Sequence, residues 1–136
     1  MGASRGPFEP EYSELPGQIP VFPLSGALLL PGGRLPLNIF EPRYLSMVRD
    51  VMAQPHRLIG MIQSRDDSED DKLFDVGCAG RISSYSETDD GRMLITLSGT
   101  SRFRRLDCDD GAAGYRLASV SWSEFKSDLV PCETEI

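Results

Sequence analysis

Residues 35–52, with the sequence LPLNIFEPRYLSMVRDVM, decide the fold because the spacing of apolar residues changes within them. Leu35, Leu37 and Ile39 alternate with other residues, which is typical of a strand with one buried face. After Pro42 the apolar residues recur at spacings of three and four, which indicates one face of a helix, and proline is well tolerated in a first helical turn. We therefore predict a strand followed by a helix near residues 42–53. The apolar stripe of that helix would consist of Tyr44, Leu45, Val48, Val51 and Met52.

The rest of the chain is expected to be mainly β. Its 13 glycines and 10 prolines interrupt the sequence too often for long helices and favour short strands joined by turns. Pro20 and Pro23 place the first strand at an edge of the sheet, because proline cannot donate a hydrogen bond to a central ladder. The apolar and alternating runs predict strands at 19–23, 57–63, 74–86, 92–97, 101–108 and 115–122.

The length of 136 residues corresponds to a single domain. Residues 1–18 lack apolar periodicity, and we expect them to form a flexible amino-terminal arm. Residues 19–122 contain all the predicted elements and would form the folded domain. Residues 123–136 show neither a cap nor a turn, and we expect a tail or linker there.

The charge balance excludes several classes of protein. Fourteen basic and 21 acidic residues give a net charge of −7, which opposes attraction to phosphate and makes nucleic acid an unfavourable partner. Apolar runs stay far below the ~20 residues needed to span a bilayer, so no membrane partner is expected. Because Glu9, Glu11 and Glu14 interrupt the start of the chain, we also expect no signal peptide and a cytoplasmic location.

The residues needed for catalysis or for metal binding are not found in suitable patterns. The two lysines, Lys72 and Lys126, do not follow a glycine-rich loop, so the phosphate-binding sequence of ATPases is missing. Both lysines lie in polar surroundings, which leaves a Ser-Lys dyad without a credible base. His56 is the only histidine, and the three cysteines form no CxxC pair. We therefore expect no catalytic residues, no metal and no cofactor.

One basic cluster leaves an alternative open. Arg102, Arg104 and Arg105 surround Phe103, and a basic cluster with an aromatic residue can bind RNA. Alternation in a strand points Phe103 into the core, however, with the arginines extending outward. We expect this structural role, and RNA binding remains the alternative.

Several segments, in order and spacing, resemble the amino-terminal domain of the Lon protease family, across about residues 19–122. The sequence of residues 39–44, IFEPRY, is most similar to that of bacterial stand-alone Lon-domain proteins. The matching segments are IPVFPL (19–24), LPLNIFEPRY (35–44), LIGM (58–61), LFDVGCAGRI (73–82) and LITLSGTSRF (94–103).

The resemblance implies a PUA-like fold, a bent β pseudo-barrel with one inserted helix. It also implies a non-catalytic role in binding polypeptide substrates, since the ATPase and the Ser-Lys peptidase of full-length Lon lie outside this domain. In stand-alone members a helical region follows, so residues 123–136 would lead toward such a region. A PUA-like RNA-binding module and a purely structural or oligomerisation domain are the alternatives.

The candidate polypeptide-binding residues are Leu28, Leu29, Leu30 and Phe40. Taken singly, Leu28 and Leu30 are each expected to fill the core, as most leucines do. Alternation nevertheless places Leu29 on the face opposite to its two neighbours, so at least one of the three should reach the surface. An unfolded or extended polypeptide is the expected partner at this surface.

Overall fold

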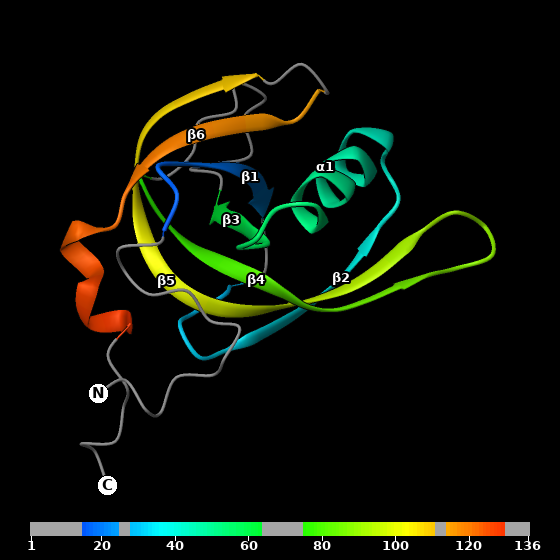
Figure 1. Ribbon diagram of the computed structural model, residues 1–136, viewed down its shortest axis with the longest axis horizontal. Coiled ribbons are helices and arrows are strands. Elements are labelled where there is room, and N and C mark those ends of the chain that lie inside the picture. Colours follow the sequence, from blue (N-terminus) through cyan, green and yellow to red (C-terminus); the bar gives the residue numbers. More distant parts are fainter. Residues whose placement is uncertain (1–14, 25–27, 64–74, 111–113, 130–136) are drawn as a thin grey trace, which may run out of the picture.

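The computed structural model describes residues 15–24, 28–63, 75–110 and 114–129, which form six strands, one α-helix and one 3-10 helix (Figure 1). The predicted mainly β class is confirmed. None of these helices has the length and apolar character required to cross a membrane. The elements are β1 (Gln18–Leu24), β2 (Arg34–Ile39), α1 (Pro42–Met52), β3 (Leu58–Gln63), β4 (Val76–Glu87), β5 (Met93–Asp110), β6 (Arg116–Ser121) and η2 (Ser123–Leu129).

The strands form one bent sheet that closes into a ring. Neighbouring strands follow the order β2-β5-β4-β3-β1-β6, and β6 also pairs with β5. The long strand β5 allows this closure, since β4 runs along one of its edges while β2 and then β6 pair with successive parts of the other. Figure 1 shows β5 curving from the β4–β5 hairpin round to β6. The expected bent pseudo-barrel is thus confirmed as a ring rather than a regular barrel.

One prediction about the strands was wrong at Gly99. Two strands were expected at 92–97 and 101–108, whereas β5 is continuous from Met93 to Asp110. Gly99 lies inside this strand because another backbone approaches it closely. A Cβ atom at Gly99 would lie 2.0 Å from the carbonyl oxygen of Leu30, and the Gly99 N–H donates to the Gly33 oxygen at 2.8 Å. The glycine marks this close contact rather than the end of a strand.

The prediction that the first strand is an edge strand was also wrong. β1 lies between β3, to which it is parallel, and β6, to which it is antiparallel. Its prolines are accommodated because the two partners pair with different halves of β1. Pro20 is in register with β6 only and Pro23 with β3 only, so each proline has a neighbouring strand on one side.

Helix α1 packs its apolar face against the sheet. Figure 1 shows the helix between β2 and the start of β6, beside the opening of the ring. Tyr44, Val48 and Val51 of the predicted stripe are buried, and Leu45 and Met52 pack at its border. Met47 is fully buried as well, although the predicted stripe did not include it. The helix thereby closes a core that it shares with β2, β3, β4 and β5.

The described residues at both ends of the domain make contacts that the sequence did not indicate. Leu15 packs against the core, and the indole N–H of Trp122 donates to the Pro16 carbonyl oxygen at 2.7 Å. After β6 the chain forms η2, where a tail or linker was expected. The remaining parts of the predicted arm and tail, residues 1–14 and 130–136, lie outside the described residues.

Candidate functional site

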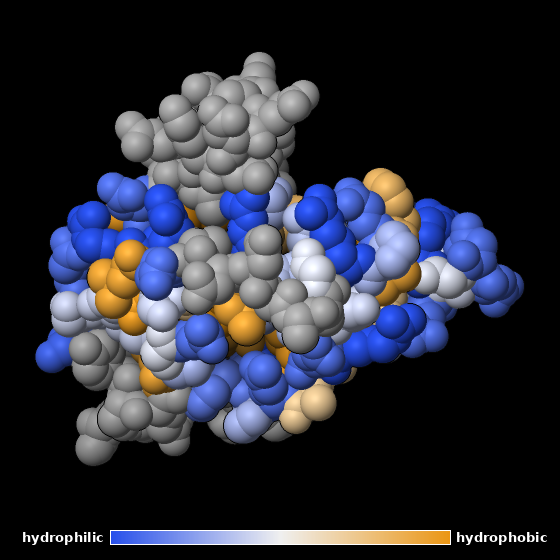
Figure 2. Space-filling model, turned by 90° about the horizontal axis from the view of Figure 1, so that it is seen from above, coloured by the Kyte–Doolittle hydropathy of each residue, from blue (hydrophilic) through white to orange (hydrophobic). Residues whose placement is uncertain are grey.

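Two of the exposed apolar side chains lie beside a hollow on the surface. Among the coloured side chains of the face seen in Figure 2, hydrophilic ones predominate, with several hydrophobic ones between them. Among the described residues, the large exposed apolar side chains are Leu28, Leu30, Phe40, Tyr85, Leu94 and Leu106. Leu28 and Leu30 border a cavity of about 420 Å³, which we call the leucine groove. Its lining consists of Leu28, Leu29, Leu30, Met61, Ile62, Gln63, Asp75, Val76, Gly77, Cys78 and Arg102.

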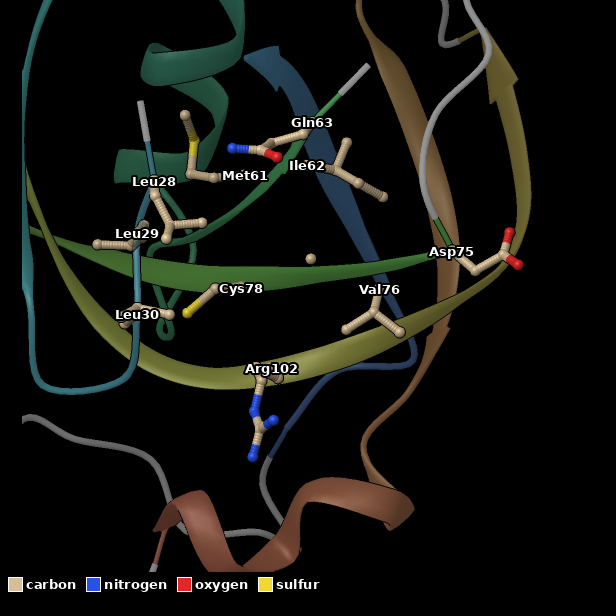
Figure 3. A pocket seen from close by; sticks show the side chains of 11 residues that line it. Leu28, Leu29, Leu30, Met61, Ile62, Gln63, Asp75, Val76, Cys78 and Arg102 are labelled. Carbon is tan, nitrogen blue, oxygen red and sulfur yellow. The ribbon is translucent and has the colours of Figure 1, made fainter. Parts of the chain in front are cut away.

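Four segments that are distant in sequence build the leucine groove (Figure 3). Residues 28–30 form one wall, and the carboxyl-terminal half of β3 and the first residues of β4 form the base and the opposite side. Arg102 comes from β5, the neighbour of β4. The groove therefore exists only because β3, β4 and β5 lie side by side in the ring.

The three leucines alternate between the surface and the core. Leu28 and Leu30 are 62% and 54% exposed, whereas Leu29 is 4% exposed. The expectation that at least one leucine reaches the surface is confirmed. The expectation that Leu28 and Leu30 fill the core was wrong, because the central residue Leu29 takes that place. Leu29 belongs to the same core cluster as α1.

Three glycines shape this segment: Gly80 on β4, and Gly32 and Gly33 in the turn that follows Leu30. A Cβ atom at Gly80 would lie 2.8 Å from Leu29 Cδ2, so the absence of a side chain there provides the space that Leu29 fills. After Leu30 the chain turns back, and the Gly33 N–H donates to the Leu30 carbonyl oxygen at 2.8 Å. Gly32 has a φ of +82° in this turn, a conformation that favours glycine. The leucine segment is therefore positioned by the space at Gly80 and by the turn that follows Leu30.

Phe40 does not belong to the leucine groove. It is 64% exposed and lies between the end of β2 and the start of α1, but it is not among the residues that line the cavity. The structure thus brings Leu28, Leu29 and Leu30 together at one site. It places the fourth candidate residue on another part of the surface.

The guanidinium of Arg102 is bound by a carboxylate outside the groove. Its Nε and Nη2 atoms donate to the two Asp128 carboxylate oxygens at 3.0 Å each, and the Arg102 backbone N–H donates to the same group at 3.0 Å. Its Cζ atom also lies 4.8 Å from the ring centroid of Phe125. These hydrogen bonds hold the pKa of Asp128 below its usual value, so the carboxylate is ionised at neutral pH.

The other arginines of the basic cluster are paired with carboxylates too. Arg104 contacts Glu124 of η2, and Arg105 Nη2 lies 3.3 Å from Asp75 Oδ1. Phe103 is fully buried, which confirms its expected place in the core. Each of these arginines therefore has a carboxylate partner, an arrangement that differs from an open row of cations for phosphate.

Cys78 contributes a neutral side chain to the groove. It is 4% exposed, and burial, with a smaller contribution from the charge of Asp128, raises the pKa of the Cys78 thiol to about 12. The thiol therefore remains protonated at neutral pH and lacks the thiolate that a nucleophile or a metal ligand requires. Its role in the groove is that of a small apolar group.

The sequence did not identify most of the lining residues. In the sequence, nothing distinguishes Met61, Ile62 and Val76 from other strand residues. They come together in space only because β3 and β4 are neighbouring strands. Asp128 gave no signal either, because its partner Arg102 is 26 residues away. The consecutive leucines at 28–30 were the one local signal, since a strand-like segment cannot bury all three on one face.

Comparisons with known proteins point to one family. A family model described as the ATP-dependent protease La (LON) substrate-binding domain matches residues 18–134. Lon protease 2 of Sorangium cellulosum is 27% identical over 106 residues, which cover 75% of this chain and 13% of that protein. Protein cereblon of Danio rerio is 30% identical over 105 residues, which cover 75% of this chain and 24% of that protein. The chain thus spans only a small part of the curated relatives that it matches.

Solved structures give a similar result. The Lon N-terminal domain protein from Xanthomonas campestris has a TM-score of 0.62 at 32% sequence identity, covering 77% of this chain and 59% of that chain. The N-terminal domain of the Mycobacterium avium complex Lon protease also has a TM-score of 0.62, over 77% of this chain and 54% of that one. Its identity of 14% shows a common fold alone.

Proposed function

This chain belongs to the family of ATP-dependent protease La (LON) substrate-binding domains, and on that basis we propose that it binds unfolded or extended polypeptide segments in the leucine groove. One observation carries the proposal: Leu28 and Leu30 are exposed on either side of a buried leucine, at the border of an apolar cavity. Exposed apolar surface beside a hollow is typical of an interaction site. Single exposed leucines elsewhere on the surface need no such explanation.

The chemistry of the groove suits apolar side chains of a flexible ligand. Met61, Ile62 and Val76 line the groove, and the Cys78 thiol in its wall is neutral. Leu28 and Leu30 are already partly buried, so covering their exposed parts would contribute about 2–3.5 kcal/mol. Ordering of the polypeptide would offset part of this gain. We therefore expect weak binding that tolerates different sequences and depends little on salt.

The alternative of an RNA-binding surface receives less support. Arg102, Arg104 and Arg105 each contact a carboxylate, and the chain has a net charge of −7. Phosphate binding would require these ion pairs to be given up, against an unfavourable long-range potential. Binding of polypeptide needs neither change.

We infer further that the chain has no peptidase or ATPase activity of its own. The family model that it matches describes a substrate-binding domain. Its two lysines lie at positions 72 and 126, and neither follows a glycine-rich loop. The purified protein should therefore leave casein intact and release no phosphate from ATP, and activity that persists through further purification would contradict this inference.

Two variants test the proposed binding site. Fluorescence anisotropy would measure the affinity of the wild type for a labelled, permanently unfolded polypeptide. Replacing both Leu28 and Leu30 by serine should lower the affinity by at least about tenfold, since that corresponds to only 1.4 kcal/mol. Phe40→Ser is the matched control, because Phe40 is equally exposed but lies outside the groove. Equal affinities of the wild type and the double variant, with the fold intact, would remove this groove from consideration.

A further inference from the structure

The described wall of the leucine groove contains one cationic side chain, Arg102, and this cation is directed away from the apolar residues. Figure 3 shows the Arg102 side chain pointing from β5 toward η2 rather than toward Leu28–Leu30. Asp128 of η2 accepts three hydrogen bonds from Arg102, two from the guanidinium and one from the backbone. A bidentate pair of this kind fixes direction as well as distance.

The environment of Asp128 makes this arrangement firm. Its side chain is only 9% exposed, whereas that of Arg102 is 46% exposed. The Phe125 ring, which also belongs to η2, lies under the guanidinium. Separating this pair would be costly, because it would leave the negative charge of a nearly buried carboxylate without a compensating positive charge. The positive charge of Arg102 is thus neutralised at the border of the groove.

On the side of the groove away from the leucines, Figure 3 shows the carboxylate of Asp75, which is turned outward and is paired with Arg105. Asp75 lines the cavity, and its side chain is 64% exposed. Arg105 contacts it through a single atom pair at 3.3 Å, a looser arrangement than the bidentate pair of Asp128. The chain as a whole has a net charge of −7, which favours the approach of cationic ligands.

We propose that Asp128 determines the charge preference of the leucine groove. By holding Arg102 in a bidentate pair, it leaves Asp75, whose single contact with Arg105 is looser, as the more accessible charge. The groove therefore favours extended segments with lysine or arginine beside apolar residues. This inference rests on the proposed function, because it concerns which polypeptides bind at the same site. Segments with aspartate or glutamate beside the apolar residues bind less well. Asp128 is a specificity-determining residue that acts through Arg102 and need not contact the ligand.

The size of the preference follows from the exposure of the charges. Exposed ion pairs contribute about 0.2–1 kcal/mol, which corresponds to a change in affinity of about 1.4- to 5-fold. The preference should weaken with added salt, because charges at a surface are screened. The apolar part of the affinity should remain.

Two peptides of equal length and leucine content provide the probe. One carries two lysines beside the leucines and the other carries two glutamates at the same positions. Their dissociation constants would be measured with the wild type at low salt and at high salt. We expect the lysine peptide to bind about two- to fivefold more tightly at low salt.

Three single substitutions test the role of Asp128. Asp128→Asn keeps the shape of the side chain but removes the negative charge that compensates Arg102, and it should reduce or reverse the preference for the lysine peptide. Glu124→Gln is the matched control, because it alters the neighbouring pair with Arg104, which does not line the groove. It should leave the preference unchanged. Asp75→Asn should reduce the preference by removing the accessible carboxylate.

The outcomes separate the two proposals. If the wild type binds neither peptide, the proposed function fails and this inference fails with it. If it binds both equally, polypeptide binding stands but the charge preference is wrong. An unchanged preference in Asp128→Asn, with the fold intact by circular dichroism, would overturn the role of Asp128. If Asp128→Asn does not fold, Asp75→Asn decides, since an unchanged preference there contradicts the charge distribution on which the inference depends.

Discussion

Gly77 and Phe103 are opposite residues of the β4–β5 pair, and the ring of Phe103 occupies the space in which a side chain at position 77 would lie. A Cβ atom at Gly77 would be 2.9 Å from Phe103 Cζ and 2.6 Å from the Met61 carbonyl oxygen. Phe103 is fully buried, and its ring also makes an edge contact with Trp122. The close contact at this glycine therefore links the base of the leucine groove to the core cluster that contains Phe103 and Trp122.

Gly77→Ala should destabilise the protein by about 1–3 kcal/mol, because neither a buried ring nor a backbone carbonyl can move aside easily. Urea unfolding followed by Trp122 fluorescence would measure the change. Gly17→Ala is the control, since a Cβ atom there meets nothing within 4 Å. Equal stabilities of the two variants would show that the contacts at Gly77 relax without cost.

Val48→Asp should cost several kcal/mol, because it places a charge without a partner in the fully buried face of α1. A loss of that size is a large part of the about 5–15 kcal/mol that stabilises a typical domain. Gln54→Asp introduces the same group at an exposed position just after the helix and should have little effect. A melting temperature of Val48→Asp equal to that of the wild type would contradict the observed packing of α1.

Stability should fall at high pH because of one tyrosine. The Tyr115 hydroxyl donates to Asp50 Oδ2 at 2.6 Å and joins the start of β6 to α1. Burial, followed by this hydrogen bond, raises the pKa of Tyr115 from 10.0 to about 12. The folded state therefore favours the protonated phenol, so its contribution is complete below pH 10 and is lost as the pH rises through 12.

The comparison with Tyr115→Phe isolates this contribution. The variant should be less stable at neutral pH by about 1–3 kcal/mol, because it removes a hydrogen bond to a charged group. Its free energy of unfolding should also depend less on pH between 10 and 12 than that of the wild type. Identical pH profiles of the two proteins in this range would contradict the assignment.

Local patterns predicted the elements whose residues are close in sequence. The change of apolar spacing around Pro42 located β2 and α1, and the alternation at Leu28–Leu30 indicated exposed leucines. The resemblance to the Lon family supplied the bent ring and the class of function, and the comparisons confirm the family. These features depend on neighbours in the chain or on similarity to known sequences.

The features that the sequence did not predict depend on distant parts of the chain. The position of β1 between β3 and β6 follows from closure of the ring. Pro20 and Pro23, considered without that closure, suggested an edge strand. Two strands were expected on either side of Gly99 because the Leu30 carbonyl that approaches this glycine lies in another segment. The pair of Arg102 and Asp128 forms only when η2 folds back onto β5. No periodicity within one segment carries such information.

Mapping of the bound surface tests the role of the leucine groove most directly. An unfolded polypeptide would be titrated into isotope-labelled protein, and the shifts of the assigned amide signals would be followed. We predict that the shifts concentrate at Leu28–Leu30, at the end of β3 and at Val76–Cys78, while Phe40 and Leu94 remain unaffected. Shifts that centre on Phe40 and Leu94, or no shifts at saturating polypeptide, would contradict the assignment of polypeptide binding to this groove.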